Sequence, residues 1–492
     1  MEDLGTTKRL ERQLERHEAA IDMAVDRLGL PLHVLFLEEM EQAARGFLNV
    51  ASSTYPNSIV AFAAKSNPCR GALRAAGRLG LGADTASEYE LRAALEEDID
   101  PSRITCNGNA KSDRYLREAI AADALIAVDN ADEIDRLESL AQERSLRPRI
   151  LIRLRGMPLS GLTSEDQTTA SDWTKFGFHL EEAPALFAHL KSSPLQFAGI
   201  SAHIGTQIAN AVGYERLLAH FFDVAQAAIS AGLEMRFIDV GGGFPVRFLS
   251  EADWRRFTER LLKRLRGQAP IEEAVTWSDL PMGYDRTRND ASAAWVGKSY
   301  FTDHPAADML QYLLDYTFED GRTTVERLEE IGSPTLIIEP GRSLMAPAGV
   351  TLCEVMGVKQ VLGHHVVALD LGINNHGTNL ISPDIFPSAV LPVADEDGDE
   401  SIEAFLAGRL CFSGDMISKA KVPLNRLPTR GDRFILFHTG AYGADHFASQ
   451  SCGFPRPAKA AIHADGRIEV WREADRFEDV FGPAGDSLRL DS

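Results

Sequence analysis

The sequence predicts an α/β protein, with a (β/α)8 barrel of the TIM type followed by a C-terminal all-β domain. Eight short apolar segments recur between residues 58 and 344, and amphipathic helical stretches separate them. Eight strands alternating with helices over roughly 280 residues fit a barrel, whereas the alternative, a doubly wound sheet, commonly has fewer strands. After residue 349 the helical stretches give way to short β-like runs. These runs predict a second domain built from strands.

Composition and charge favour a small-molecule substrate. The chain has 492 residues, a formal charge of −21 and a pI near 5.1, and such a surface attracts neither nucleic acid nor an anionic membrane. No apolar run approaches the roughly 18 residues needed to span a bilayer, and the charged N-terminus lacks the apolar region of a secretory signal. The five cysteines are widely spaced and form no Cys-x-x-Cys pair. We therefore expect no disulfide framework, no metal site and a cytoplasmic protein.

The first elements precede the barrel strands. Residues 1–30 are expected to form an N-terminal helical extension, in which a charged amphipathic helix runs over 8–28 and ends at Gly29. A short strand over 32–37 can pair with the β domain, and a helix over 38–47 leads into the barrel.

The barrel domain is expected to span residues 31–345. Its strands are predicted where apolar, partly β-branched runs end at turn residues. These runs are 58–65, 81–87, 104–109, 125–130, 150–156, 197–205, 237–245 and 335–344. About 90 residues separate the last two runs, which predicts an insertion at about 250–330 with one or two extra helices.

The C-terminal β domain is expected to span residues 346–492. Its strands are predicted over 351–362, 365–372, 409–413, 433–439 and 459–471, and the last run is a hairpin that turns at Asp465-Gly466. An acidic run at 394–403 is interpreted as a solvated loop.

Polar residues gather at or just past the ends of the predicted barrel strands. Among them, Lys65 follows the first strand. An ammonium desolvated there has a lowered pKa, so the amine becomes a nucleophile able to form a Schiff base. A lysine after a strand more often extends its ammonium to solvent. In a parallel barrel, however, the carboxyl ends of all strands meet at one mouth, where active sites are built.

Three further motifs have both a functional and a plain interpretation. Three glycines at 241–243 follow a predicted strand and can offer backbone N–H groups to a phosphate, although such a run alone more often marks a tight turn. His203 can contact a ligand, although a single histidine is usually a core residue. Glu339 and Arg342 can hold a cofactor, or they can form an ordinary ion pair.

Together these parts match the needs of pyridoxal 5'-phosphate. This cofactor requires an amine for its aldehyde, N–H groups and a cation for its phosphate, a ring to stack on its own ring, and a carboxylate at its pyridine nitrogen. A protonated pyridine stabilises the carbanion that forms when an amino acid loses CO2.

The sequence resembles the fold type III, alanine racemase-like decarboxylases, the family of the diaminopimelate, ornithine and arginine decarboxylases. The matching stretches follow the family order from about residue 32 to 460. They are 62–67 (FAAKSN), 82–87 (GADTAS), 175–177 (KFG), 203–207 (HIGTQ), 239–245 (DVGGGFP), 339–342 (EPGR), 411–415 (CFSGD), 440–443 (GAYG) and 454–457 (FPRP).

The resemblance implies an enzyme that uses pyridoxal 5'-phosphate to decarboxylate an amino acid at its α-carbon. It implies a homodimer whose active sites are shared across the interface. Lys65 would form the Schiff base, Glu339 would pair with the ring nitrogen, and Cys411 of the partner subunit would protonate the product carbanion. The other cofactor contacts that the resemblance implies are Asp84, Arg153, His203, Thr206, Gly241, Gly242, Gly243, Gly341, Arg342 and Tyr442.

The sequence departs from this family at two places. Decarboxylases of the group usually carry an acidic residue after the cysteine, where this chain has Phe412, and the diaminopimelate enzymes carry an arginine where it has Ser382. We therefore expect a substrate other than diaminopimelate, ornithine or lysine, free or conjugated, with a different distal group. Phe412, Asp384 and Asn379 are the candidate substrate contacts.

Two alternatives stay open. An amino-acid racemase on the same fold would use the same cofactor, although alanine racemases place an arginine at the pyridine nitrogen, where this chain has Glu339. The other alternative is a catalytically inactive homologue that binds pyridoxal phosphate and regulates a partner. Such relatives lose the lysine or the phosphate contacts, which this chain keeps.

Overall fold

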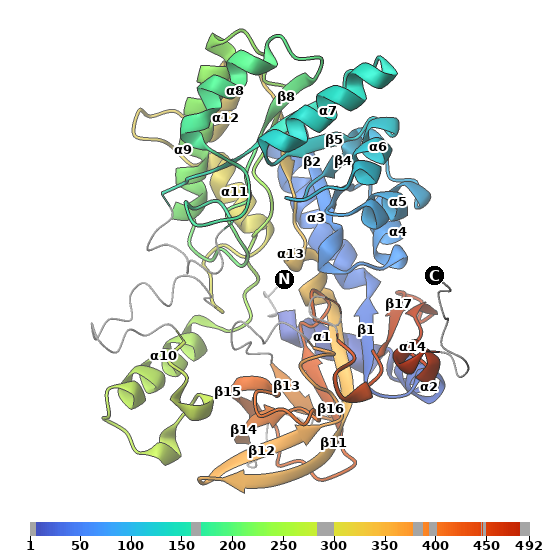
Figure 1. The fold of residues 1–492 in the computed structure, drawn as a ribbon. Helices are drawn as coiled ribbons and strands as arrows, with labels where there is room; N and C mark the ends of the chain where they lie inside the picture. The colour runs from blue at the N-terminus through green and yellow to red at the C-terminus, as the bar shows by residue number, and fades with distance from the viewer. Residues whose placement is uncertain are drawn as a thin grey trace, which may run out of the picture. The chain divides into compact units, whose positions relative to one another are not determined.

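The computed structural model describes residues 6–158, 169–282, 300–376, 387–392, 401–443, 445 and 449–482. The chain forms two compact units, coloured along the sequence in Figure 1. The barrel unit comprises Glu39–Arg266 and Pro281–Pro347, and the sheet unit comprises Met1–Glu38, Gly267–Leu280 and Ala348–Ser492. Each unit contains a sheet of its own.

Eight parallel strands close into a barrel in the barrel unit. They are β2 (Ser58–Ala63), β3 (Gly82–Thr85), β4 (Ile104–Cys106), β5 (Leu125–Val128), β6 (Arg149–Arg155), β8 (Gln196–Ser201), β9 (Phe237–Asp239) and β10 (Thr335–Ile338). Neighbours in this order pair with each other, and the pairing of β10 with β2 closes the ring. A two-residue strand, β7 (Phe178–His179), adds to β6. The predicted barrel and its eight strands are thus confirmed.

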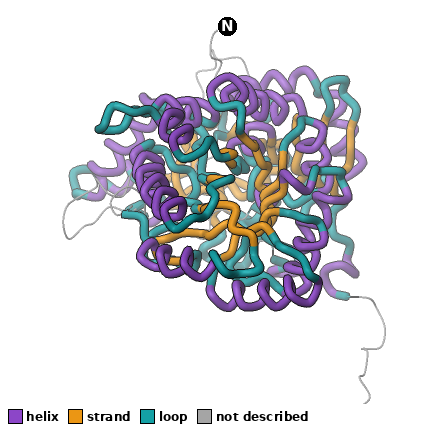
Figure 2. The backbone as a smooth tube through the Cα atoms, turned by 90° about the horizontal axis from the view of Figure 1, so that it is seen from above, coloured by secondary structure: helices purple, strands orange, loops and turns teal. Residues whose placement is uncertain are grey.

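Helices surround the strands, as Figure 2 shows from above, with helices in purple and strands in orange. They are α3 (Leu37–Thr54), α4 (Arg70–Arg78), α5 (Glu88–Glu96), α6 (Asp113–Ala121), α7 (Ala131–Arg144), α8 (Ala183–Leu190), α9 (Val212–Ser230), α11 (Ala307–Asp315) and α12 (Thr324–Glu330). The same unit also contains α10 (Glu251–Leu265) and the short α13 (Arg342–Met345). Ser87, Ser112 and Asn130 start α5, α6 and α7 by accepting a hydrogen bond from a backbone N–H of the first turn. Among the described residues, α10 to α12 lie between β9 and β10, where extra helices were predicted.

The barrel interior is filled by small and branched side chains. Ala61, Ala127 and Ala198 pack there with Leu151 and Ile337, and each is at most 1% exposed. Because both faces of a parallel barrel strand are buried, the strands are almost continuously apolar. Polar side chains are therefore concentrated at the strand ends.

The sheet unit is built on nine strands. They are β1 (Leu32–Phe36), β11 (Gly349–Val361), β12 (His364–Leu369), β13 (Ser388–Val390), β14 (Ile402–Ala407), β15 (Met416–Leu424), β16 (Arg433–Phe437), β17 (Ala458–Ile462) and β18 (Ile468–Arg472). The main order is β15-β14-β12-β11-β1-β17-β18, with β16 on β11 and β13 on β16. The early strand β1 lies between β11 and β17, and the predicted hairpin at Asp465-Gly466 joins β17 to β18.

Two element predictions for this unit were wrong. The helix expected over 8–28 is two helices, α1 (Thr6–Arg16) and α2 (Glu18–Leu28), because His17 leaves the helical conformation and its ring stacks on Phe36 at 6.1 Å between centroids. The strand expected over 409–413 is a turn, since the carboxylate of Asp415 accepts the backbone N–H of Leu410 at 2.6 Å. A side chain that binds the local backbone in this way competes with strand pairing.

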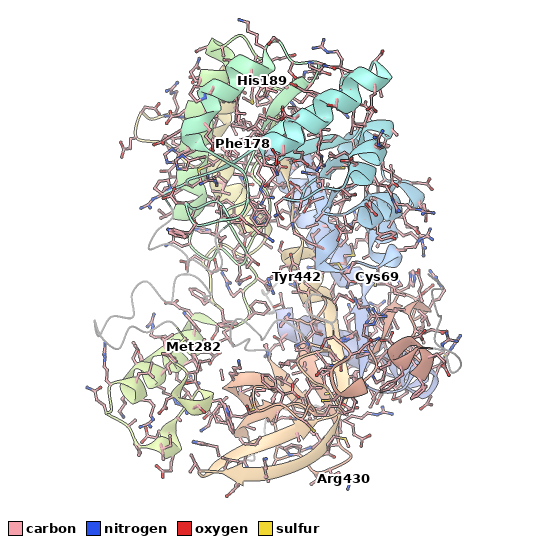
Figure 3. The ribbon with its side chains drawn as sticks, viewed as in Figure 1. Cys69, Phe178, His189, Met282, Arg430 and Tyr442 are labelled. Carbon is pink, nitrogen blue, oxygen red and sulfur yellow. The ribbon has the colours of Figure 1, made fainter. Side chains whose placement is uncertain are left out.

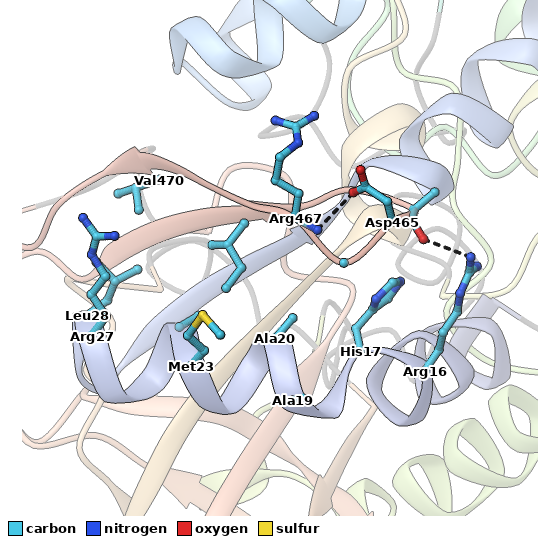
Figure 4. A pocket seen from close by; sticks show the side chains of 14 residues that line it. Arg16, His17, Ala19, Ala20, Met23, Arg27, Leu28, Asp465, Arg467 and Val470 are labelled. Carbon is cyan, nitrogen blue, oxygen red and sulfur yellow. Dashed lines mark hydrogen bonds between the residues drawn. The ribbon is translucent and has the colours of Figure 1, made fainter.

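The N-terminal helices belong to the core of the sheet unit. Leu10, Leu14 and Ile21 pack with residues of β1, β11 and β17. A groove of about 670 Å³ lies between α2 and the β17–β18 hairpin (Figure 4), where small residues such as Ala20 leave space. Arg16 closes one end by donating to the carbonyl of Ala464 at 3.0 Å. A short helix, α14 (Phe477–Phe481), is the last described element.

The described residues contain neither a candidate membrane-spanning helix nor a candidate metal site. None of their helices combines the length and the apolar character that crossing a membrane requires. No cluster of three or more histidine, cysteine, aspartate or glutamate side chains among them is arranged to hold a metal ion.

Candidate active site

The mouth of the barrel collects the polar residues that end its strands. Each barrel strand contributes at or just past its carboxyl end, and these ends meet at one rim. The contributing residues are Lys65 after β2, Asp84 on β3, Asn107 after β4, Asp129 after β5, Arg153 on β6, His203 after β8, Asp239 on β9 and Glu339 after β10. Most of the residues predicted from strand ends are therefore brought to the same rim.

A hydrogen-bonded chain connects the lysine to the glutamate. The ammonium of Lys65 donates to Asp84 Oδ2 at 2.9 Å. The side-chain amide of Asn107 donates to Asp84 Oδ1 at 2.8 Å and to Glu339 Oε1 at 2.9 Å. Asp84 is 1% exposed and Glu339 is 3% exposed. Burial by itself would raise the pKa of Asp84, but Lys65 and these hydrogen bonds lower it, so Asp84 is a carboxylate that holds the lysine in place.

Glu339 and Asp239 form a buried acid pair. Burial raises the pKa of Glu339 well above its ordinary value, and the negative charges of Asp239 and Asp84 raise it further. Burial also raises the pKa of Asp239, which accepts the backbone N–H of Gly241 at 2.9 Å. Two buried carboxyl groups in contact cannot both ionise easily, so the pair holds a proton at neutral pH. A cation that came close would release that proton and leave a carboxylate beside the cation.

His203 and Arg153 are also held in fixed positions. Desolvation, with the charges of Lys65 and Arg153, lowers the pKa of His203 to about 3, so its ring is neutral. The ring Nδ1 accepts the backbone N–H of Gly205 at 3.1 Å. Arg153 is 7% exposed, its guanidinium lies 4.1 Å from the centroid of the Phe176 ring, and it is 3.7 Å from Asp129 Oδ1. A neutral flat ring and a fixed cation suit a flat, partly charged ligand.

The glycines after β9 and β10 are needed for close approach of the backbone. A Cβ atom on Gly242 would lie 2.5 Å from the carbonyl oxygen of Glu339, and one on Gly243 would lie 2.6 Å from the carbonyl oxygen of Gly205. A Cβ on Gly341 would lie 2.9 Å from the side chain of Ala63. Any side chain at these positions would push the strand-end loops apart.

A possible anion site lies beside these glycines. The guanidinium of Arg342 lies 3.5 Å from the hydroxyl of Thr206. The neighbouring Ser343 is 1% exposed, and its hydroxyl has no hydrogen-bond partner among the described residues. A cation, hydroxyl groups and glycine N–H groups together have the chemistry that a phosphate requires.

Cys411 and Phe412 of the sheet unit lie on an exposed turn after β14. The two carboxylate oxygens of the buried Asp415 accept the backbone N–H groups of Ile373 at 2.7 Å and Leu410 at 2.6 Å. Gly414 has no side chain, which leaves room for the Phe412 ring. Cys411 is exposed and Phe412 is 57% exposed. The turn is therefore well anchored, while its thiol and ring face outward.

The remaining candidates are in the sheet unit or outside the described residues. Tyr442, marked in Figure 3, lies in the loop after β16 and has a φ of +62°, which is uncommon for a residue with a side chain. The substrate candidates Asp384 and Asn379 lie outside the described residues, as does Ser382.

Sequence reasoning missed several residues of the mouth. Asn107 was not singled out, because the third predicted barrel strand reached residue 109 whereas β4 ends at Cys106. Asp239 was part of a quoted motif but received no role, and Asp129 follows β5 directly. A rule that inspects the first polar residue after each apolar run would have found Asn107 and Asp129.

The sequence is similar to those of known decarboxylases. A family model described as "Pyridoxal-dependent decarboxylase, pyridoxal binding domain" matches residues 41–276. The diaminopimelate decarboxylase of Aquifex aeolicus is 24% identical over 93% of this chain and 92% of its own length. The diaminopimelate decarboxylase of Methanothermobacter thermautotrophicus is 27% identical over 94% of this chain and 92% of its own length.

A solved structure shares the fold. The crystal structure of diaminopimelate decarboxylase from M. jannaschi superposes with a TM-score of 0.72 at 21% sequence identity and covers 96% of this chain and 95% of that protein. The likeness extends over both units and supports the predicted fold of a barrel with a β domain.

Proposed function

Because the chain belongs to the family of pyridoxal-dependent decarboxylases, we propose that it removes the α-carboxyl group of an amino acid as CO2. Its cofactor is pyridoxal 5'-phosphate. When bound, this cofactor supplies the electron sink for the electron pair that the departing CO2 leaves behind.

The residues at the barrel mouth fit this cofactor. Lys65 offers an amine that Asp84 holds at 2.9 Å. Arg342, Thr206 and the orphan hydroxyl of Ser343 offer the donors that a phosphate needs. We propose that His203 faces the flat side of the ring and that Tyr442 adds a phosphate contact.

The acid pair is the observation that carries the proposal. Glu339 is buried, and burial together with the charge of Asp239 raises its pKa well above the ordinary value. Such a pair can keep a pyridine nitrogen protonated and then hold it as an ion pair, which favours loss of CO2. An arginine at this place would keep the nitrogen unprotonated, which is why Glu339 supports decarboxylation over racemisation. The intact Lys65 and phosphate donors likewise support an active enzyme over an inactive homologue.

We also propose a homodimer in which Cys411 of the partner subunit completes each site. An exposed thiol beside a 57% exposed phenylalanine on an anchored turn supports this assignment, because large exposed apolar side chains on rigid loops are typical of interfaces. The thiol would deliver a proton to the carbon from which CO2 departs.

The second part of the proposal concerns the chemical nature of the substrate's distal group. The names of the relatives make diaminopimelate the first substrate to test. Against it stand Phe412 and Ser382, since neither can pair with a distal charge. We propose an amino acid whose distal end contacts the Phe412 ring.

A substrate screen tests both the proposed reaction and the proposed distal group of the substrate. Purified protein with added pyridoxal phosphate should show the visible absorption near ~420 nm of a lysine adduct. CO2 release is then measured with diaminopimelate, ornithine, lysine and arginine, and with amino acids that have apolar or conjugated distal groups. CO2 from any of these supports decarboxylation, and loss of optical rotation without CO2 would replace it by racemisation. Efficient turnover of diaminopimelate would refute only the distal-group proposal.

A further inference from the structure

Lys111 is a buried lysine that contacts none of the proposed cofactor-binding residues. It precedes α6, and its side chain is 1% exposed. Its ammonium donates to the carbonyl of Gly108 at 2.8 Å, to the carbonyl of Ala127 at 2.6 Å and to Glu133 Oε2 at 3.1 Å. These three contacts use all the protons of the ammonium group.

Each contact anchors a loop of the barrel mouth. Gly108 follows Asn107, the residue that donates to both Asp84 and Glu339. Ala127 belongs to β5, just before Asp129. Glu133 also accepts the backbone N–H of Asp129 at 2.8 Å. The loops after β4 and β5 thus share one cation as their common anchor.

We propose that Lys111 is a positioning residue of the active site. It sets Asn107 against the acids Asp84 and Glu339, and it sets Asp129 against Arg153. The inference rests on the function proposed above, because it assigns Lys111 a role in holding the cofactor-binding mouth.

An apolar side chain would not replace Lys111. It could fill the same space, but the carbonyls of Gly108 and Ala127 would lose the ammonium donor, and the buried carboxylate of Glu133 would lose its cation and keep the backbone N–H of Asp129. Buried groups that lose a partner are costly, and the backbone would shift to reach water. The shift would displace Asn107 and Asp129 together.

This displacement should raise the pKa of Asp84, and with it the pH at which cofactor binding weakens. Asn107 and the positive charge of Arg153 both favour the charged form of Asp84, so loosening either raises its pKa. The charged and titratable groups that act on Asp84 from the surrounding elements are Lys65, Glu90, Cys106, Tyr115, Arg153, His203, Asp239 and Glu339. The Lys111 network reaches Asp84 through Asn107, and it reaches Arg153 through Asp129.

The experiment titrates the full-length protein with pyridoxal phosphate from pH 3 to 9, a range extended to low pH because the pKa of Asp84 is lowered, and follows the visible absorption. For Lys111→Met we expect the affinity for pyridoxal phosphate to fall about tenfold. In a plot of affinity against pH, the acid limb, where affinity falls at low pH, should move upward by about half a pH unit. Glu133→Gln keeps an acceptor for Lys111 and for Asp129, so its limb should move in the same direction by less. The control is Leu116→Ala, which removes a fully buried side chain from the adjacent helix α6 and should lower stability without moving the limb.

Three results would overturn the inference. One is a Lys111→Met protein that binds the cofactor with the wild-type profile. Another is an equal shift in Leu116→Ala, which would mean that any loss of stability moves the limb. If Lys111→Met does not fold, an unshifted limb in Glu133→Gln overturns it. Absence of the absorption in the wild-type protein would instead refute the proposed function, and the inference with it.

Discussion

The barrel unit and the sheet unit differ in how their buried carboxyl groups are paired with cations. At the barrel mouth four buried carboxyl groups accompany the cations Lys65 and Arg153, and they are those of Asp84, Asp129, Asp239 and Glu339. Acid groups are in excess there, and the pKa of Glu339 is raised.

In the sheet unit one carboxylate is surrounded by cations. Asp445 accepts hydrogen bonds from Lys459 and, at 2.6 Å, from Arg472. Although burial would raise the pKa of Asp445, the two cations lower it. A buried carboxylate that is fully paired with cations is typical of a structural ion pair. Buried carboxyl groups that outnumber the nearby cations have raised pKa values, and such groups are typical of active sites.

The units also differ in where their reactive candidates lie. Those of the barrel unit are buried or partly buried around Asp84, while Cys411 of the sheet unit is exposed on its surface. Buried groups can be tuned by their neighbours, but an exposed thiol needs a second surface to exclude water. The comparison therefore predicts that mutations in the barrel unit change the cofactor's chemistry, and that mutation of Cys411 on the turn at 409–415 changes the last proton transfer.

The largest effect is expected at the barrel mouth. Lys65→Ala removes the amine, so decarboxylation should fall below detection, and borohydride should no longer fix the cofactor covalently to the protein. Mass spectrometry of the reduced protein measures the adduct. Lys263→Ala on α10 is the control and should behave as wild type. A persisting adduct on another residue would end the assignment of Lys65.

The next effect tests the acid pair. Glu339→Gln keeps the shape and the contact with Asn107 but cannot form an ion pair, so kcat should fall by roughly 10²–10³ while the cofactor still binds. Steady-state kinetics and cofactor titration separate the two quantities. Glu97→Gln, which changes a carboxylate paired with Arg70 and Arg74, is the matched control. Retained turnover in Glu339→Gln would remove the acid pair from the mechanism.

Cys411→Ala tests the exposed candidate of the sheet unit. It should lower kcat by about 10² and leave cofactor affinity unchanged, since the thiol is proposed to act only after CO2 has left. Cys452→Ala removes the other exposed cysteine of the same unit and should have no effect. Product analysis that showed normal turnover would leave Cys411 without a catalytic role.

A mixing experiment tests whether the sites are shared. Lys65→Ala and Cys411→Ala proteins, each impaired alone, should regain about a quarter of wild-type activity when mixed in equal amounts, because half of the random dimers then carry one intact site. Unmixed proteins and a size measurement in solution are the controls. No recovery despite subunit exchange would mean that each site is built from one chain.

A smaller effect is expected from the anchor of the turn. Asp415→Ala leaves two backbone N–H groups without their acceptor, which should cost about 1–3 kcal/mol of unfolding free energy and lower kcat through Cys411. Asp432→Ala, at another turn of the same unit, is the matched control for stability. If both variants lose equal stability and keep kcat, the turn does not position the thiol.

The last prediction concerns how the free energy of unfolding depends on pH. Burial lowers the pKa of His376 to about 4, and burial with the charge of Arg9 lowers that of His438 to about 3. The unfolded chain therefore binds more protons below pH ~6.5, and the free energy of unfolding should fall as pH decreases towards 4, by at most ~1.4 kcal/mol per pH unit for each histidine. Denaturant unfolding at pH 7 and 5 measures this slope. His438→Gln should flatten it, and an unchanged slope would contradict the assignment.

The sequence by itself determined the fold and the outline of the site. The alternation of apolar runs with helical stretches predicted every barrel strand, because both faces of such strands are buried and the pattern is strong. It predicted Lys65, Glu339 and the glycines at 241–243 because each follows a run that ends abruptly. The turn at 409–415 was misjudged because the carboxylate of Asp415 accepts the backbone N–H of Leu410, five residues earlier.

Only the tertiary structure decided how these residues are connected. That Asn107 joins Asp84 to Glu339, or that Lys111 anchors two loops, follows from side chains far apart in sequence that meet at one rim. Strand periodicity encodes which residues are buried, but the partners of a buried charge depend on closure of the barrel. The proton shared by Asp239 and Glu339 is a property of that closed arrangement.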